Sequence, residues 1–267
     1  MQIIKPSSFR GSRHALQAVN GLLLPGLILL LGCVFPAMGN GQISLNGEAG
    51  VVTTGYNNVG IPGNSGTRFS MKDDLKGDPI PFFRLRAKVS LTSRHHLVLL
   101  YAPLELRYHG TFDEEVLFRN VLFEAGKETE GTYKFNSYRL TYRYRLVQRP
   151  KLDFDLGLTA KIRDASIGLN AMGKSAIKTD LGFVPIIHFR LHWMWSERYS
   201  LLFEGDALAS PFGRAEDVLL ASQFALSEQV ALYAGYRLLE GGTDGSTVYN
   251  FSMFHYITAG CVWQIRP

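Results

Sequence analysis

After residue 39 the sequence has no long apolar run. No stretch there approaches the roughly 18 consecutive apolar residues that a membrane-spanning helix needs. The mean hydropathy of +0.01 likewise excludes a multi-helix membrane bundle. Any membrane role must therefore use strands, because only helices and closed sheets satisfy their backbone groups inside a bilayer.

Charge and cysteine are also scarce. Charged residues make up 19% of the chain, which is low for a soluble globule, whereas aromatic residues reach 12%. Three of the 28 Lys and Arg residues lie in the first 39 positions, which leaves 25 against 23 Asp and Glu, so charge gives no support to a nucleic-acid partner. Only Cys261 lies beyond the leader that contains Cys33, and this excludes an intrachain disulfide in the mature chain.

Residues 1–39 have the pattern of a secretory signal peptide. Lys5, Arg10 and Arg13 precede an apolar stretch at 21–35, which is too short for a comfortable membrane span. Small residues at Ala37 and Gly39 then provide a signal-peptidase site. The alternative is lipoprotein processing at Cys33. The mature domain is predicted to be residues 40–267.

The rest of the chain alternates with a period of two, which is typical of half-buried strands. In residues 83–92, apolar side chains occupy the odd positions, and Arg84, Arg86 and Lys88 occupy even ones. Residues 137–146 and 152–163 show the same alternation. Ten strands are predicted, at 42–54, 80–92, 97–110, 133–146, 151–164, 180–195, 199–209, 215–226, 229–239 and 247–265.

The connections between these strands differ in length on the two sides. Strands two and three, four and five, six and seven, and eight and nine are joined by tight polar turns. Longer segments at 55–79, 111–132, 165–179 and 240–246, with a short link at 210–214, join the others. Short turns on one side and long loops on the other are typical of outer-membrane barrels. The sequence therefore predicts an all-β, closed, antiparallel up-and-down transmembrane barrel of about ten strands, with eight or twelve as alternatives and four or five surface loops.

The last predicted strand carries a more specific pattern. Thr258, Gly260, Trp263 and Ile265 are spaced like the C-terminal β-signal of outer-membrane proteins, although Arg266 and Pro267 depart from the usual aromatic ending. Aromatic residues also concentrate near the predicted strand ends, as in interfacial girdles. The chain thus resembles Gram-negative outer-membrane β-barrel proteins as a class. The resemblance implies residence in the outer membrane, contact with its lipid and lipopolysaccharide, and recognition by the barrel assembly machinery.

The alternation also predicts which charges face the lumen. The inward basic residues are Arg84, Arg86, Lys88, Arg107, Arg139, Arg143, Arg145, Lys161, Arg163, Arg190 and Arg237. The inward acidic residues are Glu48, Glu105, Asp153, Asp155, Glu204, Asp206 and Asp217. A barrel of this size is narrow enough for side chains to fill it. The first hypothesis is a salt-bridged, largely filled lumen in a structural or surface-binding protein, and the second is a narrow, porin-like pore that prefers anions.

Three groups of residues resemble motifs with a chemical role. Residues 168–175 fit the phosphate-loop pattern, but the expected strand–loop–helix context is missing, so a mobile loop is favoured. His188 and His192 lie on one strand face, ~13 Å apart, too far to share a metal. Asp73, Asp74 and Asp78 lack the alternation of a calcium loop.

A surface enzyme acting on lipid A or peptides is the third functional hypothesis. Its candidates are His109, the Glu204–Asp206 pair, and Ser252 with His255, although the last two are expected on opposite strand faces. No catalytic residue, metal or cofactor is assigned, and the oligomeric state is left open.

Overall fold

The computed structural model describes residues 42–211 and 213–265, so the predicted signal peptide and its alternative processing at Cys33 lie outside the described residues. No helix in the described part is long and apolar enough to cross a membrane. The described strands are β1 (Gln42–Gly60), β2 (Phe69–Ser70), β3 (Ile80–Ser90), β4 (His95–Ala102), β5 (Glu105–Thr111), β6 (Val116–Phe118), β7 (Val121–Phe123), β8 (Glu128–Arg149), β9 (Leu152–Ala171), β10 (Lys174–Met194), β11 (Tyr199–Ser210), β12 (Gly213–Ala225), β13 (Val230–Asp244) and β14 (Tyr249–Ile265).

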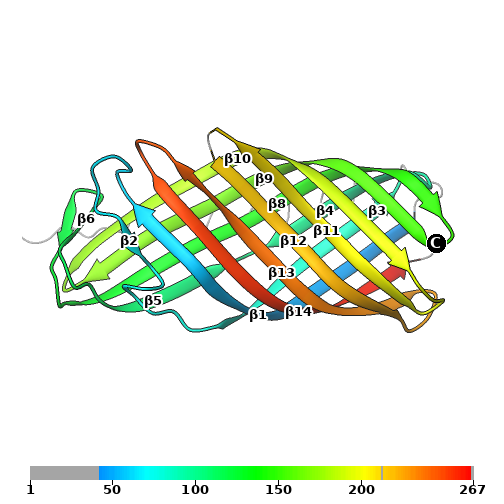
Figure 1. Ribbon diagram of the computed structural model, residues 1–267, viewed down its shortest axis with the longest axis horizontal. Helices are drawn as coiled ribbons and strands as arrows, with labels where there is room; N and C mark the ends of the chain where they lie inside the picture. Colours follow the sequence, from blue (N-terminus) through cyan, green and yellow to red (C-terminus); the bar gives the residue numbers. More distant parts are fainter. Residues whose placement is uncertain (1–41, 212, 266–267) are drawn as a thin grey trace, which may run out of the picture. The chain divides into compact units, whose positions relative to one another are not determined.

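These strands close into an antiparallel barrel of ten wall strands, which we call staves (Figure 1). Each stave pairs with the next along the chain, and β14 pairs with β1 from Ile43–Ile265 to Gly60–Tyr249, which closes the sheet. β4 and β5 form one stave, because both pair with β8 on either side of Pro103 and Leu104. The predicted fold class and strand number are confirmed.

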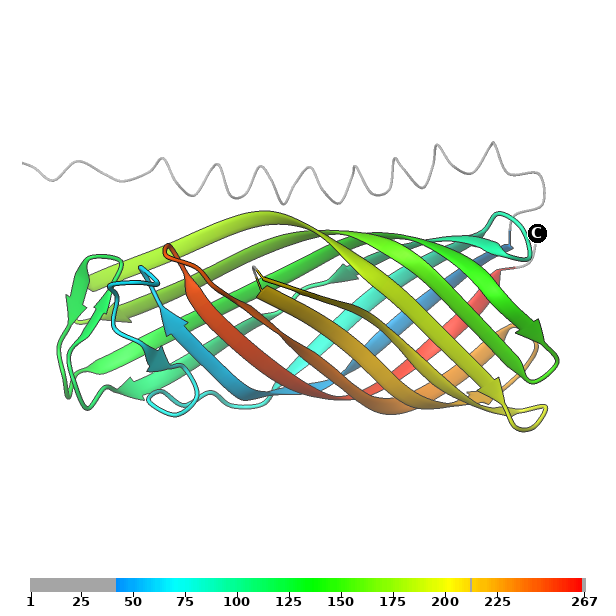
Figure 2. The same ribbon diagram turned by 45° about the horizontal axis from the view of Figure 1, so that its top comes forward.

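The two ends of the barrel differ. At the end that holds Gln42 and Ile265, which we call the terminal end, the four connections are the short turns that the sequence predicts. At the opposite end, the loop end, the chain carries two long connections, 61–79 and 112–127. Both fold over the loop end, and they contain β2 and the small β6–β7 hairpin (Figures 1 and 2).

The prediction of a loop at 165–179 is wrong. β9 and β10 continue through it and meet in a two-residue turn at Met172 and Gly173, both of which have positive φ. Positive φ at both central positions is the geometry of tight hairpin turns. Small and polar residues such as Ser166 and Asn170 are compatible with these strands because they lie beyond the apolar part of the wall.

The outer wall is apolar in a band and polar beyond it. On β9, Leu156, Leu158 and Ile162 are exposed, whereas Asp164 interrupts the apolar row toward the loop end. Aromatic residues near the terminal end of the wall include Trp193, Trp195 and Trp263. This distribution fits a wall that contacts lipid between two interfaces.

The interior has two different layers. Toward the loop end it is an apolar core, in which Phe69, Met71, Phe118 and Phe123 of the two long connections pack against inward residues of the wall such as Leu106. Phe69 meets the ring of Phe112 edge-on at 5.3 Å. Below this core, toward the terminal end, the inward residues are mostly charged.

Candidate functional site

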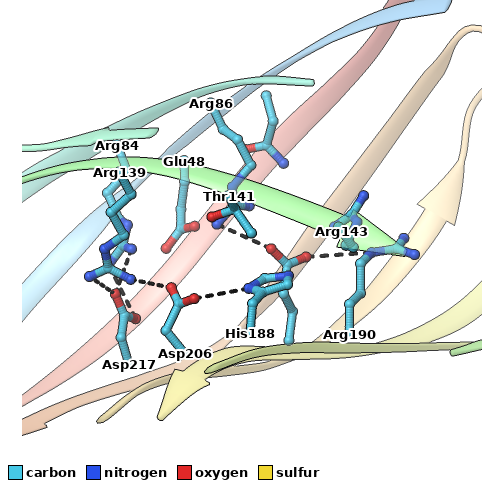
Figure 3. Close-up of polar contacts among 12 residues, drawn as sticks. Glu48, Arg84, Arg86, Arg139, Thr141, Arg143, His188, Arg190, Asp206 and Asp217 are labelled. Atoms are coloured by element: carbon cyan, nitrogen blue, oxygen red, sulfur yellow. Dashed lines mark hydrogen bonds and ion pairs between the residues drawn. The ribbon is translucent and has the colours of Figure 1, made fainter. Parts of the chain in front are cut away.

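A buried carboxylate, Asp217 of β12, lies at the centre of the charged layer. Its Oδ2 accepts from Arg84 at 2.7 Å and lies 2.6 Å from Nη2 of Arg139, while its Oδ1 accepts from Arg237 at 2.5 Å. The three arginines come from β3, β8 and β13, so a single carboxylate joins four staves. Figure 3 shows Asp217 with Arg84 and Arg139. Buried charge is tolerated only with such pairing.

Two further carboxylates complete this layer. Glu48 of β1 accepts two bonds from the guanidinium of Arg237, both of 2.8 Å. Asp206 of β11 pairs with Arg139 at 2.5 Å, accepts from Thr159 at 2.7 Å and lies 3.0 Å from Nδ1 of His188 (Figure 3). We call Glu48, Arg84, Arg139, Asp206, Asp217 and Arg237 the central charge layer.

A second cluster lies nearer the terminal end. Asp155 pairs with Arg143 at 3.1 Å and Arg145 at 2.9 Å, and Arg145 also reaches Asp153 at 3.2 Å. In the same cluster, Glu204 lies 3.4 Å from Arg86 and 3.5 Å from Arg190. Apart from Asp155, these residues line a cavity of about 230 Å³, to which Lys88 and His192 also contribute.

A larger cavity, of about 380 Å³, lies toward the loop end on the other side of the central charge layer. Its lining combines apolar residues with Lys161, Arg163 and Lys178. None of the six central-layer residues lines either of the two cavities. A pocket of about 10 Å³ reaches Arg84 and Arg139.

The predicted lumen residues mostly face inward, but Glu105 and Arg107 do not, and their assignment is wrong. Both side chains are more than half exposed on the outside of β5, where they pair at 3.7 Å. Leu106 and Tyr108 face the interior instead and are fully buried. The sequence prediction places the charged residues of this strand in the lumen. At the level of β5, however, the interior of the barrel is the apolar loop-end core and the outer surface is polar.

The other residues predicted for the lumen charge network face inward, although Lys88 and Lys161 have no ion pair within 4.0 Å among the described residues. Arg84, Arg86, Lys88, Arg139, Arg143, Asp155, Lys161, Arg190, Glu204 and Asp206 all lie on the inner face. Sequence reasoning missed His188 and Thr159 as partners of Asp206. The alternation places both residues on the inner face. Whether their side chains reach Asp206 depends on the register of β10 with β9 and β11, which the sequence does not give.

The enzyme candidates are separated. Ser252 points inward, 2.9 Å from the hydroxyl of Tyr133, whereas His255 lies on the outer face, 2.5 Å from Tyr236. Glu204 and Asp206 are buried in the barrel rather than placed at its rim, and His109 is exposed on the outside of β5.

The phosphate-loop pattern and the loop aspartates also find structural explanations. Residues 168–175 form the tip of the β9–β10 hairpin, so they have no helix whose amino end could bind phosphate. Asp73 and Asp74 accept hydrogen bonds from Ser70 in the first long connection. Within the described residues, no three His, Cys, Asp or Glu side chains gather as a metal site.

The fold can be compared with solved structures. The outer membrane protease OmpT from Escherichia coli is similar, with a TM-score of 0.51 at 10% identity, over 84% of this chain and 97% of that one. The Ail protein of Yersinia pestis (TM-score 0.36, 13% identity, 85% and 99% covered) and Neisserial surface protein A (0.33, 15%, 84% and 97%) also match. No family model and no curated protein matches the sequence.

This chain has the outer-membrane β-barrel fold. The apolar band of its wall and the closed ten-stave sheet together place the protein in a cell outer membrane. At such low identity the likeness describes the fold alone, and the role of this barrel has to come from its own residues.

Proposed function

We propose that this outer-membrane barrel is a closed, non-conducting protein that serves as a rigid platform for binding at the cell surface. The observation that carries this proposal is the central charge layer. Its six ion-paired side chains lie between two cavities and line neither of them. Water and ions passing through the barrel would have to disrupt pairs of 2.5–2.7 Å between buried groups.

The loop-end core supports the same proposal. Phe118 and Phe123 of the β6–β7 hairpin are fully buried within that end of the barrel. Backbone hydrogen bonds join the two long connections, from Thr67 to Leu117 at 3.0 Å and from Arg119 to Ile61 at 2.8 Å. Because long loops lie on the outside in such barrels, the loop end faces the medium and presents this packed surface to partners.

Recordings in planar lipid bilayers test the proposal. The refolded barrel, with folding verified by faster migration of the unheated sample on a gel, should give no steady conductance. The alternative hypothesis, a narrow pore, rests on the excess of cations around the terminal-side cavity. Stable channels that prefer anions would overturn the closed-barrel proposal in favour of that pore.

A further inference from the structure

The wall of the barrel has a gap near the loop end. β10 pairs with β9 from Lys174 onward, but its pairing with β11 begins only at Ile187, opposite Ala207. The β11–β12 hairpin ends at Ser210 and Gly213, far short of the β9–β10 hairpin (Figures 1 and 2). The β6–β7 hairpin contacts the first residues of β10, where Arg119 donates to the carbonyl of Ile177 and Lys174 donates to that of Leu122. Residues 178–186 of β10 thus form a free edge above the β11–β12 hairpin, with no partner strand on that side among the described residues. We call this gap the lateral notch.

The cavity of about 380 Å³ adjoins this notch. Its lining includes Lys178, Asp180 and Val184 of the free edge and residues 213–215 of the short hairpin. Its volume lies in the range of small-ligand sites, ~300–1,000 Å³. The apolar part of its lining includes Ile61, Phe135, Ile167, Leu239, Val248 and Phe254.

Lys161 supplies a buried amino group to this cavity. Its side chain is 3% exposed, and its ammonium lies 4.8 Å from the centre of the Phe135 ring. Among the described residues, no carboxylate lies within 4.0 Å of that ammonium, whereas Arg163 and Arg214 in the same lining are paired with Asp180 and Glu240. An unpaired buried ammonium costs several kcal/mol, and an anionic ligand would relieve that cost.

The base of the notch lies near Lys161. Val184, in the free edge of β10, is directly opposite Lys161 in the register with β9. An anionic group that enters through the notch therefore reaches the ammonium without crossing the central charge layer. The rest of such a ligand would lie against the apolar lining, toward the loop end.

The notch opens at the level where the outer wall changes from apolar to charged residues. On the outside of β11 and β12, Phe203 and Leu220 are exposed apolar residues, and the charged Arg214 follows near the hairpin tip. On the free edge, Leu181 and Phe183 are 76% and 67% exposed. A molecule that partitions into the membrane boundary would meet this opening with its alkyl chain.

We propose that the lateral notch and its cavity bind a single-chain alkyl carboxylate, with the carboxylate at Lys161 and the chain against the apolar lining. This inference deepens the proposed binding function, on which it rests, by naming the ligand class. Charge selects an anion at Lys161, the apolar lining selects an alkyl chain, and the lateral position of the opening selects a molecule that enters from the membrane boundary.

Photo-crosslinking tests the proposal on the full barrel in phosphatidylcholine nanodiscs. The probe is dodecanoic acid with a diazirine in its chain, and labelled peptides are mapped by mass spectrometry. Labelling should concentrate on peptides that line the cavity, around Ile167 and Phe254. Excess dodecanoate should abolish it, whereas dodecanol and dodecyltrimethylammonium should not compete. Labelling spread evenly over the lipid-facing wall, or competition by either of those two amphiphiles, would overturn the proposal.

Two pairs of variants sharpen this test. Lys161→Met should lower the labelling yield at least tenfold, whereas Lys88→Met, which removes a lysine from the other cavity, should leave it unchanged. Val184→Trp should block the notch, whereas Ile187→Trp on the outer face of the same strand should not.

The unfolding midpoint separates loss of the site from loss of the fold. In Lys161→Met it should equal or exceed that of the unchanged protein, because no ion pair is removed. Undiminished labelling of Lys161→Met would contradict the proposal. This result is independent of bilayer conductance, which tests the closed barrel itself.

Discussion

Arg139 and Asp217 face each other across the lumen, with 2.6 Å between Nη2 and Oδ2. They belong to β8 and β12, which share no backbone pairing, so their side chains connect distant parts of the wall. The second terminal nitrogen of Arg139, Nη1, lies 2.5 Å from Oδ2 of Asp206. These ion pairs therefore hold together strands that no backbone hydrogen bond connects.

Removing the charge of Asp217 should therefore destabilise the barrel strongly. Asp217→Asn leaves three buried arginines short of their shared partner, and breaking buried pairs of this type costs about 3–5 kcal/mol. The measurement is urea unfolding of the barrel in lipid or detergent. Glu105→Gln is the matched control, because that carboxylate is exposed on the outer wall, where an ion pair is worth at most about 1 kcal/mol. Equal effects of the two changes would contradict the assigned network.

The outer wall should reject charge where it meets lipid. Leu156→Arg places a cation on the exposed apolar face of β9 and should destabilise by roughly 2–4 kcal/mol near the bilayer midplane. Leu122 is exposed to a similar extent, but it belongs to the β6–β7 hairpin at the loop end. Leu122→Arg should therefore change the unfolding free energy little. If both leucines tolerated arginine equally, the placement of the lipid-facing band would be wrong.

The loop-end core should depend on its buried aromatic side chains. Phe118→Ala empties a fully buried position and should cost about 3–5 kcal/mol where the core cannot collapse. We expect limited proteolysis to cleave the connection at 112–127 in this variant while the staves stay protected. Leu122→Ala serves as the control within the same hairpin. Resistance of the Phe118→Ala protein to protease would show that the connection is held by other contacts.

The C-terminal strand should influence assembly more than stability. Gly260 faces inward, where a Cβ would lie 2.3 Å from the Tyr233 ring, so packing alone requires glycine there. Trp263 is half exposed on the outer face and is available for recognition before insertion. Trp263→Ala should slow the appearance of the heat-modifiable form in a pulse–chase experiment but leave refolding into lipid unchanged. Trp193→Ala, at a similarly exposed wall position, should slow neither process. The β-signal role would be refuted by normal assembly of Trp263→Ala.

The sequence predicts the parts of this fold that depend on alternation. Residues 83–92 and 152–163 are apolar on one face and polar on the other, and both strands have the predicted orientation. Residues 97–104 are apolar on both faces, since Val98, Leu100 and Leu104 are buried inside the barrel while the residues between them face outward. Alternation therefore indicates no orientation there, and the predicted inward orientation of Glu105 and Arg107 is wrong.

The pairing inside the barrel was beyond the reach of sequence analysis. The alternation of inward and outward positions places Arg139, Asp206 and Asp217 on the inner face, but it does not predict which of these side chains form ion pairs. That depends on the stagger of the three staves between β8 and β12, and on the position of the turn at Met172 and Gly173, which sets the lengths of β9 and β10. The lateral notch has the same origin, since it follows from unequal strand lengths.

Thiol accessibility tests the closed interior most directly. In a background with Cys33 and Cys261 replaced by alanine, Thr141→Cys places a thiol at a 4% exposed position that faces the charged interior, and Ala165→Cys places one on the inner face in the lining of the notch cavity. A charged, water-soluble maleimide should label the thiol at position 165 in the folded barrel and the thiol at position 141 only after unfolding. Rapid labelling at position 141 in the folded protein would mean that the lumen is filled with water, and it would contradict the closed barrel.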